Sequence, residues 1–108
     1  MIKYSIKDRL RKRNYIVAIY DLDDATLELK VPIEVLVDGK TDSYYDVTFD
    51  DAGYFVHGSS VTDAVNTMVK YIVVAYTRLY SEDPHRLGKN DEKQLTILNK
   101  YIQRKEMG

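Results

Sequence analysis

A stretch of twenty residues, Val61 to Tyr80, contains neither glycine nor proline and is apolar around most of a helical circumference. On a wheel of 3.6 residues per turn its polar positions form one narrow stripe, so roughly two-thirds of the surface must be covered by other segments. Ser60 is placed to accept a hydrogen bond from the Asp63 amide at the start of such a helix. The β-branched run Ile72-Val73-Val74 favours a strand, but twenty residues exceed the usual strand length. We therefore predict one long helix.

The segments before this helix alternate between apolar and polar side chains, which predicts an antiparallel sheet. We expect a buried strand at 15–20 and a second run with one apolar face at 27–37, where Pro32 indicates an edge, a bulge or a break into two strands. Asp38-Gly39 predicts a hairpin turn, followed by a return strand at 44–49. An acidic turn at 50–53 then leads into a last strand at 54–57.

The two ends of the chain carry weaker helical patterns. Ser5 resembles an N-cap, and Ile6 and Leu10 lie one turn apart, which predicts a short helix at 6–13. Asn90 is placed to cap a final helix whose apolar side carries Leu95, Leu98 and Ile102. The expected fold class is α+β in a single domain, 1–108: a short N-terminal helix, a three- or four-stranded antiparallel meander, then a long central helix and a C-terminal helix on one face.

The composition limits the classes of function. The absence of cysteine leaves no disulfide framework, no thiolate zinc site and no thiol nucleophile. No apolar run reaches the roughly 18 residues that a membrane span needs, and the N-terminus lacks a signal-peptide core. We expect a cytoplasmic protein with no membrane partner.

Charge is distributed unevenly along the chain. Residues 1–13 hold six Lys or Arg against one Asp, for a net +5, whereas residues 21–63 hold eleven acidic residues against two Lys, for a net −9. The remaining residues, 14–20 and 64–108, together carry a net +3. Such asymmetry predicts faces of opposite sign that steer partners or attract each other, and ordinary solubility explains it equally well.

The acidic residues that the alternation places on the outer face of the sheet form the first candidate site. Ten tyrosines against two phenylalanines add to it, since tyrosine is enriched at binding surfaces. The predicted partner-binding residues are Glu28, Glu34, Asp42, Tyr44, Asp46, Asp50 and Asp51.

The basic N-terminal segment forms the second candidate site, for nucleic acid. It also suits a solvated face or an internal partner for the acidic sheet. Its residues are Lys7, Arg9, Arg11, Lys12 and Arg13.

Catalytic chemistry has little support in the sequence. Asp21, Asp23 and Asp24 are carboxylates that suit Mg²⁺, Mn²⁺ or Ca²⁺, but aspartate is also a standard turn residue and no calcium-loop pattern surrounds them. No motif ties a nucleophile or a carboxylate to His57, and His85 lies in a polar loop. We expect no metal, no cofactor and no enzymatic activity.

Two resemblances add to this picture. The segment from Asp50 to Val65, DDAGYFVHGSSVTDAV, and with it residues 50–80, resembles the hairpin-to-helix passage of HicB-type antitoxins, which show an acidic turn, Gly-Tyr, a strand, a polar cap and a helix. The short, cysteine-free, tyrosine-rich and locally acidic chain also resembles small phage-encoded inhibitors, including anti-CRISPR proteins. The second resemblance implies a location in the host cell cytoplasm.

These observations predict a non-enzymatic inhibitor that uses its acidic, tyrosine-bearing sheet face to block the nucleic-acid-binding surface of a Cas-type nuclease or another basic nucleoprotein. The alternative is a small nucleic-acid-binding or HicB-like antitoxin protein that uses the basic N-terminal segment. An enzyme using the 21–24 carboxylates or His57 with a divalent ion is a third hypothesis. Homodimerisation through an open strand edge is consistent with all three.

Overall fold

The predicted long helix is the centre of the fold. The computed structural model describes residues 3–106, and in it helix α1 spans Val61–Ser81, which confirms the prediction. Ser60 Oγ accepts from the Asp63 amide at 3.0 Å, while the Asp63 carboxylate accepts from the Ser59 amide at 2.8 Å. The side chains that α1 buries are Ala64, Val65, Met68, Val69, Ile72, Tyr76 and Leu79.

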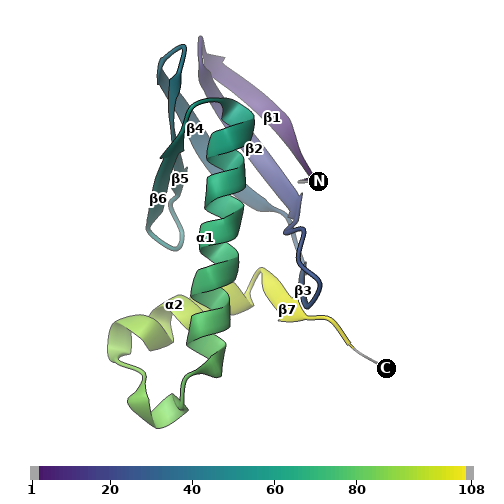
Figure 1. Cartoon of the computed structure of the whole chain (residues 1–108), viewed down its shortest axis with the longest axis vertical. Coiled ribbons are helices and arrows are strands. Elements are labelled where there is room, and N and C mark those ends of the chain that lie inside the picture. Colours follow the sequence, from purple (N-terminus) through teal and green to yellow (C-terminus); the bar gives the residue numbers. More distant parts are fainter. Residues whose placement is uncertain (1–2, 107–108) are drawn as a thin grey trace.

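A five-stranded antiparallel sheet packs against one side of α1 (Figure 1). Its strands, in spatial order, are β1 (Lys3–Arg11), β2 (Asn14–Asp21), β4 (Ile33–Thr41), β5 (Tyr44–Phe49) and β6 (Tyr54–Gly58). Alternate residues of β2, β4, β5 and β6 face the helix and are buried: Val17, Ile19, Ile33, Val35, Val37, Val47, Phe49, Tyr54 and Val56. In the described part of the chain, no helix covers the opposite side of the sheet, which we call the outer face (Figure 1).

The predicted arrangement is wrong at the N-terminus and in the number of strands. Residues 3–11 form strand β1 and not a short helix, so the sheet has five strands and not three or four. The supposed helical pair, Ile6 and Leu10, is 52% and 51% exposed, so it has no core to pack against. A helix this short is marginal without such packing, whereas an extended segment satisfies the free edge of β2. Tyr4 then reaches α1, with its hydroxyl 2.7 Å from Thr62 Oγ1.

The second predicted strand is split, as Pro32 suggested. Leu27–Leu29 forms β3, which leaves the main sheet and pairs with β7 (Ile102–Arg104) near the C-terminus. β7 was not predicted. Two further backbone hydrogen bonds extend this ribbon, from Lys30 N to Tyr101 O at 2.6 Å and from Lys105 N to Thr26 O at 2.8 Å.

Two predicted turns have different outcomes. The acidic turn at 50–53 is confirmed, with Gly53 at a positive φ of 73°. The predicted hairpin turn at Asp38-Gly39 is wrong, because both residues continue β4 and the chain turns at Asp42-Ser43. Gly39 is needed for close packing instead, since an added Cβ would lie 2.6 Å from Arg13 Cβ.

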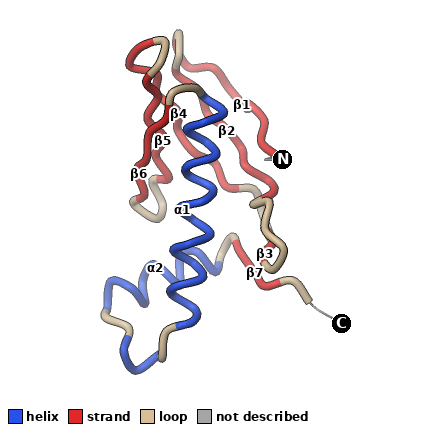
Figure 2. The backbone as a smooth tube through the Cα atoms, viewed as in Figure 1, coloured by secondary structure: helices blue, strands red, loops and turns tan. Residues whose placement is uncertain are grey.

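The second half of α1 extends past the main sheet and is covered by other elements (Figures 1 and 2). These are α2 (Lys89–Asn99), which follows a 3₁₀ turn at 84–86, and the β3–β7 ribbon. Leu79, Leu98 and Ile102 are each at most 1% exposed in this second part of the core. The predicted cap of the last helix is wrong: Gly88 is the N-cap and Asn90 is already helical.

Among the residues described, no helix is both long enough and apolar enough to cross a membrane.

Candidate protein-binding face

A row of mostly apolar side chains crosses the outer face. Strand register places one residue of the row on each of the strands β2, β4, β5 and β6. Asp8 is the β1 residue in register with Ile16, and Leu10, further along β1, lines the same shallow hollow. We call these residues the apolar row: Leu10, Ile16, Leu36, Thr48 and Phe55. Leu10, Leu36 and Phe55 are 51%, 42% and 60% exposed. The outer face is therefore an uncovered surface with an apolar centre.

A parallel row of polar side chains borders the apolar row on one side. In register from β1 to β6 this polar row is Arg11, Asn14, Asp38, Asp46 and His57. Asp38 accepts hydrogen bonds from Asn14 Nδ2 at 3.1 Å and from Lys40 Nζ at 2.6 Å. The hydrogen bond between Lys40 and Asp38 raises the pKa of Lys40. These two donors offset the repulsion between Asp38 and Asp46, which lie opposite each other in the sheet. Asp46 Oδ1 is buried and has no hydrogen-bond partner among residues 3–106.

Two stacked aromatic rings lie at the β6 end of this polar row. The Tyr44 and His57 rings are stacked, with centroids 5.2 Å apart and planes 17° apart. Tyr44 is 42% exposed, so the stacked pair presents a ring to solvent beside Asp46. This arrangement suits contact with a partner's planar or cationic side chain.

Three carboxylates gather at the other end of the outer face. Glu34, Asp50 and Asp51 line one hollow together with Pro32, Phe49 and Tyr101. The Tyr101 hydroxyl donates to Asp51 Oδ2 at 2.5 Å, and this hydrogen bond, with burial and the nearby charge, raises the pKa of Tyr101 to about 12. The hollow is a negatively charged corner of the face.

The structure brings together five of the seven predicted partner-binding residues. Glu34, Tyr44, Asp46, Asp50 and Asp51 lie on or beside the outer face, as described above. Asp42 occupies the turn between β4 and β5. Glu28 lies apart from them on β3, because β3 leaves the main sheet.

The basic N-terminal segment neutralises part of the acidic face, in agreement with the interpretation of it as an internal partner. Lys7 Nζ lies 2.6 Å from Glu34 Oε2, and Arg13 forms an ion pair with Asp42. Within residues 3–106 no ion pair involves Arg9, Arg11 or Lys12, and all three are exposed. Exposed ion pairs contribute only about 0–1 kcal/mol, so Lys7 and Glu34 exchange partners at little cost.

The carboxylates at 21–24 organise the chain locally. Asp21 Oδ1 accepts from the Asp23 amide at 2.7 Å, and Asp24 Oδ1 accepts from the amides of Thr26 and Leu27 at 2.8 and 3.0 Å. Backbone hydrogen bonds lower the pKa of both Asp21 and Asp24. Within the described residues, no three His, Asp or Glu side chains come together in a way that could hold a metal ion.

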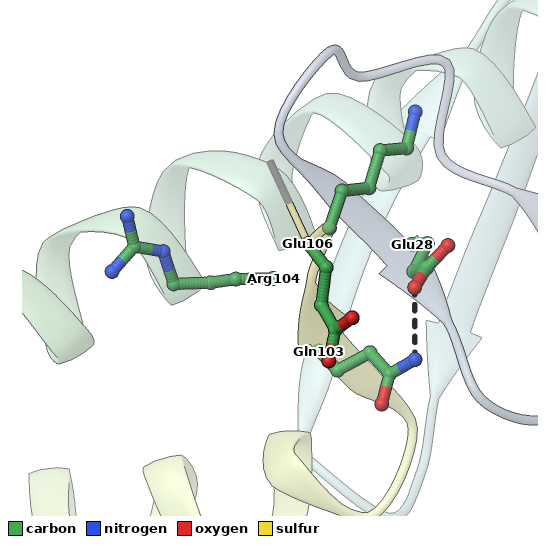
Figure 3. Close-up of a pocket in the computed structure, with 5 residues that line it drawn as sticks. Glu28, Gln103, Arg104 and Glu106 are labelled. Carbon is green, nitrogen blue, oxygen red and sulfur yellow. Dashed lines mark hydrogen bonds between the residues drawn. The ribbon is translucent and has the colours of Figure 1, made fainter. Parts of the chain in front are cut away.

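Another hollow lies on the β3–β7 ribbon and is lined by Glu28, Gln103, Arg104, Lys105 and Glu106. In Figure 3, Gln103 Nε2 donates to Glu28 Oε1 at 2.8 Å. Arg104 points away from this pair, and its guanidinium carbon lies 5.2 Å from the centroid of the Tyr80 ring. The lining mixes both signs of charge without a convergent set of reactive groups, so we assign no chemistry to it.

The sequence interpretation missed the apolar row. Leu36 and Phe55 occupy outward positions in the strand alternation, so that pattern contained the signal for them. Leu10 gave no such signal, because it reaches the outer face only when residues 3–11 form a strand. The face is consequently less acidic and more apolar at its centre than predicted.

The Tyr101–Asp51 hydrogen bond predicts a loss of stability at alkaline pH. Because the pKa of Tyr101 is raised from 10.0 to about 12 in the fold, its contribution is fully present below about pH 10 and is lost as the pH rises through about 12. Burial also raises the pKa values of Tyr54 and Tyr76, which act in the same direction. Asp51→Asn is expected to move the Tyr101 pKa back towards 10, measured by NMR titration of the Tyr101 ring. An unchanged Tyr101 pKa in this variant contradicts the assignment.

No protein-family model, no curated protein and no solved structure matches this chain. The resemblances to HicB-type antitoxins and anti-CRISPR proteins therefore depend on the sequence features alone.

Proposed function

We propose that this chain is a non-enzymatic, protein-binding inhibitor whose outer face docks on a basic, nucleic-acid-binding surface of its partner. The observation that carries the proposal is an uncovered sheet face that joins an apolar row to carboxylates at both of its ends. A Cas-type nuclease is the partner class to test first, because its nucleic-acid channel is positively charged.

The two kinds of side chain on this face have separate roles in binding. The carboxylates of Asp46, Asp50 and Asp51 attract a basic surface from a distance and raise the association rate. The side chains of Leu36 and Phe55 lose water on contact and slow the dissociation. Asp46 Oδ1, which lacks a partner within the described chain, gains a donor when an arginine or lysine of the target approaches and Asp46 adjusts its rotamer.

Charge reversal tests this proposal. Replacing Glu34, Asp46, Asp50 and Asp51 together by lysine is expected to weaken binding to a basic nucleoprotein by a hundredfold or more, roughly 3 kcal/mol, because four attractive charges become repulsive. The measurement is a calorimetric or biosensor titration against a panel of such proteins that includes Cas-type nucleases.

The matched control reverses four exposed acidic residues far from the outer face: Glu82, Asp83, Glu92 and Glu106. This control has the same change in net charge and is expected to retain most of the affinity. Equal affinities for the wild type and the outer-face variant, or equal losses in both variants, overturn the proposed site.

A second candidate function, nucleic-acid binding, is favoured by the exposed cations Arg9, Arg11 and Lys12 on β1 and the following turn. Contact of these three with phosphates predicts that log K falls with log salt at a slope of roughly −3 on duplex DNA. Fluorescence polarisation with mixed DNA and RNA probes across a salt series measures it. A flat response removes this candidate without affecting the protein-binding proposal.

A further inference from the structure

We infer that the outer face is self-complementary, and that two copies of this chain pack outer face to outer face about a two-fold axis that runs along β4. Such an axis places the β1 side of one copy over the β6 side of the other, while each row stays over the same row of the partner. The charge, the apolar row and the dimensions of the face each support this arrangement.

The outer face has opposite charges on its two sides. The β1 side carries Lys7, Arg11 and one carboxylate, Asp8, whereas the β5 side carries Asp46 and Asp50. A two-fold axis along β4, between these two sides, turns the cations of each copy towards the carboxylates of the other. The symmetry makes this contact occur twice in the dimer. Glu34 and Asp38 of β4 lie on the axis and face their own symmetry mates, and their partners within the chain, Lys7 and Lys40, offset this repulsion. The attraction between the two sides then makes the face complementary to a copy of itself, as an isologous interface requires.

The apolar row matches itself under the same operation. Because the row extends from Phe55 on β6 to Ile16 on β2, with Leu10 and Asp8 beside it on β1, the rotation lays the β1 end of each copy near Phe55 of the other, and Leu36 near its own symmetry mate. The Leu10, Phe55 and Leu36 side chains are about half exposed in one chain, at 51%, 60% and 42%, and a second copy removes them from water together. Two sheets packed in this way form a sandwich with faces about 10 Å apart.

The size of the face is adequate for a reversible dimer. Five strands of five to nine residues, with strands about 4.8 Å apart and about 3.3 Å of rise per residue, cover roughly 20 Å by 20 Å. With side-chain relief this gives an accessible area of several hundred Å² per copy, on the order of the ~800 Å² of a standard interface. We therefore expect a dimer that dissociates on dilution.

The strand edges suit self-association less well. β1 is the long edge strand, and an antiparallel β1–β1 pairing brings Lys3, Arg9 and Arg11 of two copies together. Its pairing with β2 also has three irregularities of register, which bend the strand. The face, and not the edge, is thus the surface that accepts a second copy.

This inference extends the proposed function without depending on it. A dimer covers the carboxylates that are proposed to bind a basic partner, so the second copy and the partner compete for one surface. Partner binding, if it occurs as proposed, converts the dimer into a one-to-one complex.

Sedimentation equilibrium of the whole chain over a wide concentration range tests the dimer. Leu36→Lys and Phe55→Lys are each expected to raise the dimer dissociation constant at least about tenfold, because each places a charge in the apolar row. Val74→Lys is the matched control, because Val74 is 68% exposed on α1, away from the outer face. The dimer dissociation constant of this variant is expected to equal that of the wild type.

A charge exchange tests the orientation of the two copies. Lys7→Glu and Asp50→Lys are each expected to weaken the dimer, and the double variant is expected to restore it, since the attraction between the two sides is then reversed but intact. Circular dichroism confirms that each variant is folded. A wild type that stays monomeric at every concentration, a dimer unaffected by both row variants, or a double variant as weak as the singles overturns the inference. A monomer that still binds a basic partner leaves the proposed function standing, and a dimer that binds none removes only that function.

Discussion

Replacing Ile102 by alanine is expected to lower the free energy of unfolding by about 2–5 kcal/mol, the range for deleting a large aliphatic side chain from a packed core. Ile102 is 1% exposed and lies on β7, in the part of the core that also contains Leu79 of α1 and Leu98 of α2. The change is measured by urea denaturation followed by circular dichroism.

The control for this experiment is Val74→Ala, which removes an apolar side chain that is 68% exposed on α1. Its expected effect is within about 0.5 kcal/mol, because a solvent-facing side chain loses little on truncation. A loss of less than about 0.5 kcal/mol for Ile102→Ala contradicts the placement of the C-terminal strand in the core.

Substituting Gly58 by alanine is expected to cost about 3 kcal/mol, the upper end of the usual penalty for overpacking. A Cβ at this position would lie 2.5 Å from Ala64 N and 2.7 Å from Ala64 Cα, both backbone atoms of the first turn of α1. The backbone there is held by the Ser60 and Asp63 cap, so it yields only by shifting the helix from the sheet. Thermal or urea unfolding measures the loss.

Gly88→Ser is the matched control for the Gly58 substitution. Gly88 caps α2, and an added Cβ would meet no atom of the described residues within 4 Å. Serine is at least as good an N-cap as glycine, so this variant is expected to be unchanged or slightly more stable. Similar losses for the two glycine variants show that the close approach of β6 to α1 is not the cause.

Local pattern was sufficient for the parts of the fold that depend on neighbouring residues. The helix of α1 follows from an uninterrupted 3.6-residue period and the Ser60 cap, and both are visible in the sequence. The turn at 50–53 follows from its aspartates and Gly53. The same kind of signal misplaced the hairpin turn, because Gly39 is explained by its close contacts with Arg13 and Tyr45 and not by a turn.

The candidate site was only partly visible in the same way. Alternation placed Glu34, Tyr44 and Asp46 on the outer face, and the structure agrees. The same prediction included Glu28, which the structure puts on a separate ribbon after the break at 30–32. The apolar row was missed because it exists only when the strands are in register, and register is a relation between segments.

By itself, then, the sequence determined the long amphipathic helix, its cap and the outward position of most of the carboxylates, since each follows from spacing along one segment. Only the tertiary structure decided that residues 3–11 extend the sheet, that β7 pairs with β3, and that Lys7 and Arg13 contact Glu34 and Asp42. The physical reason is that the conformation of a weakly patterned segment is set by the unpaired backbone and uncovered apolar surface it meets. The unpaired backbone and the apolar surface belong to segments distant in the chain. The free edge of β2 supplies the backbone for β1, and the second half of α1 supplies the apolar surface for β7.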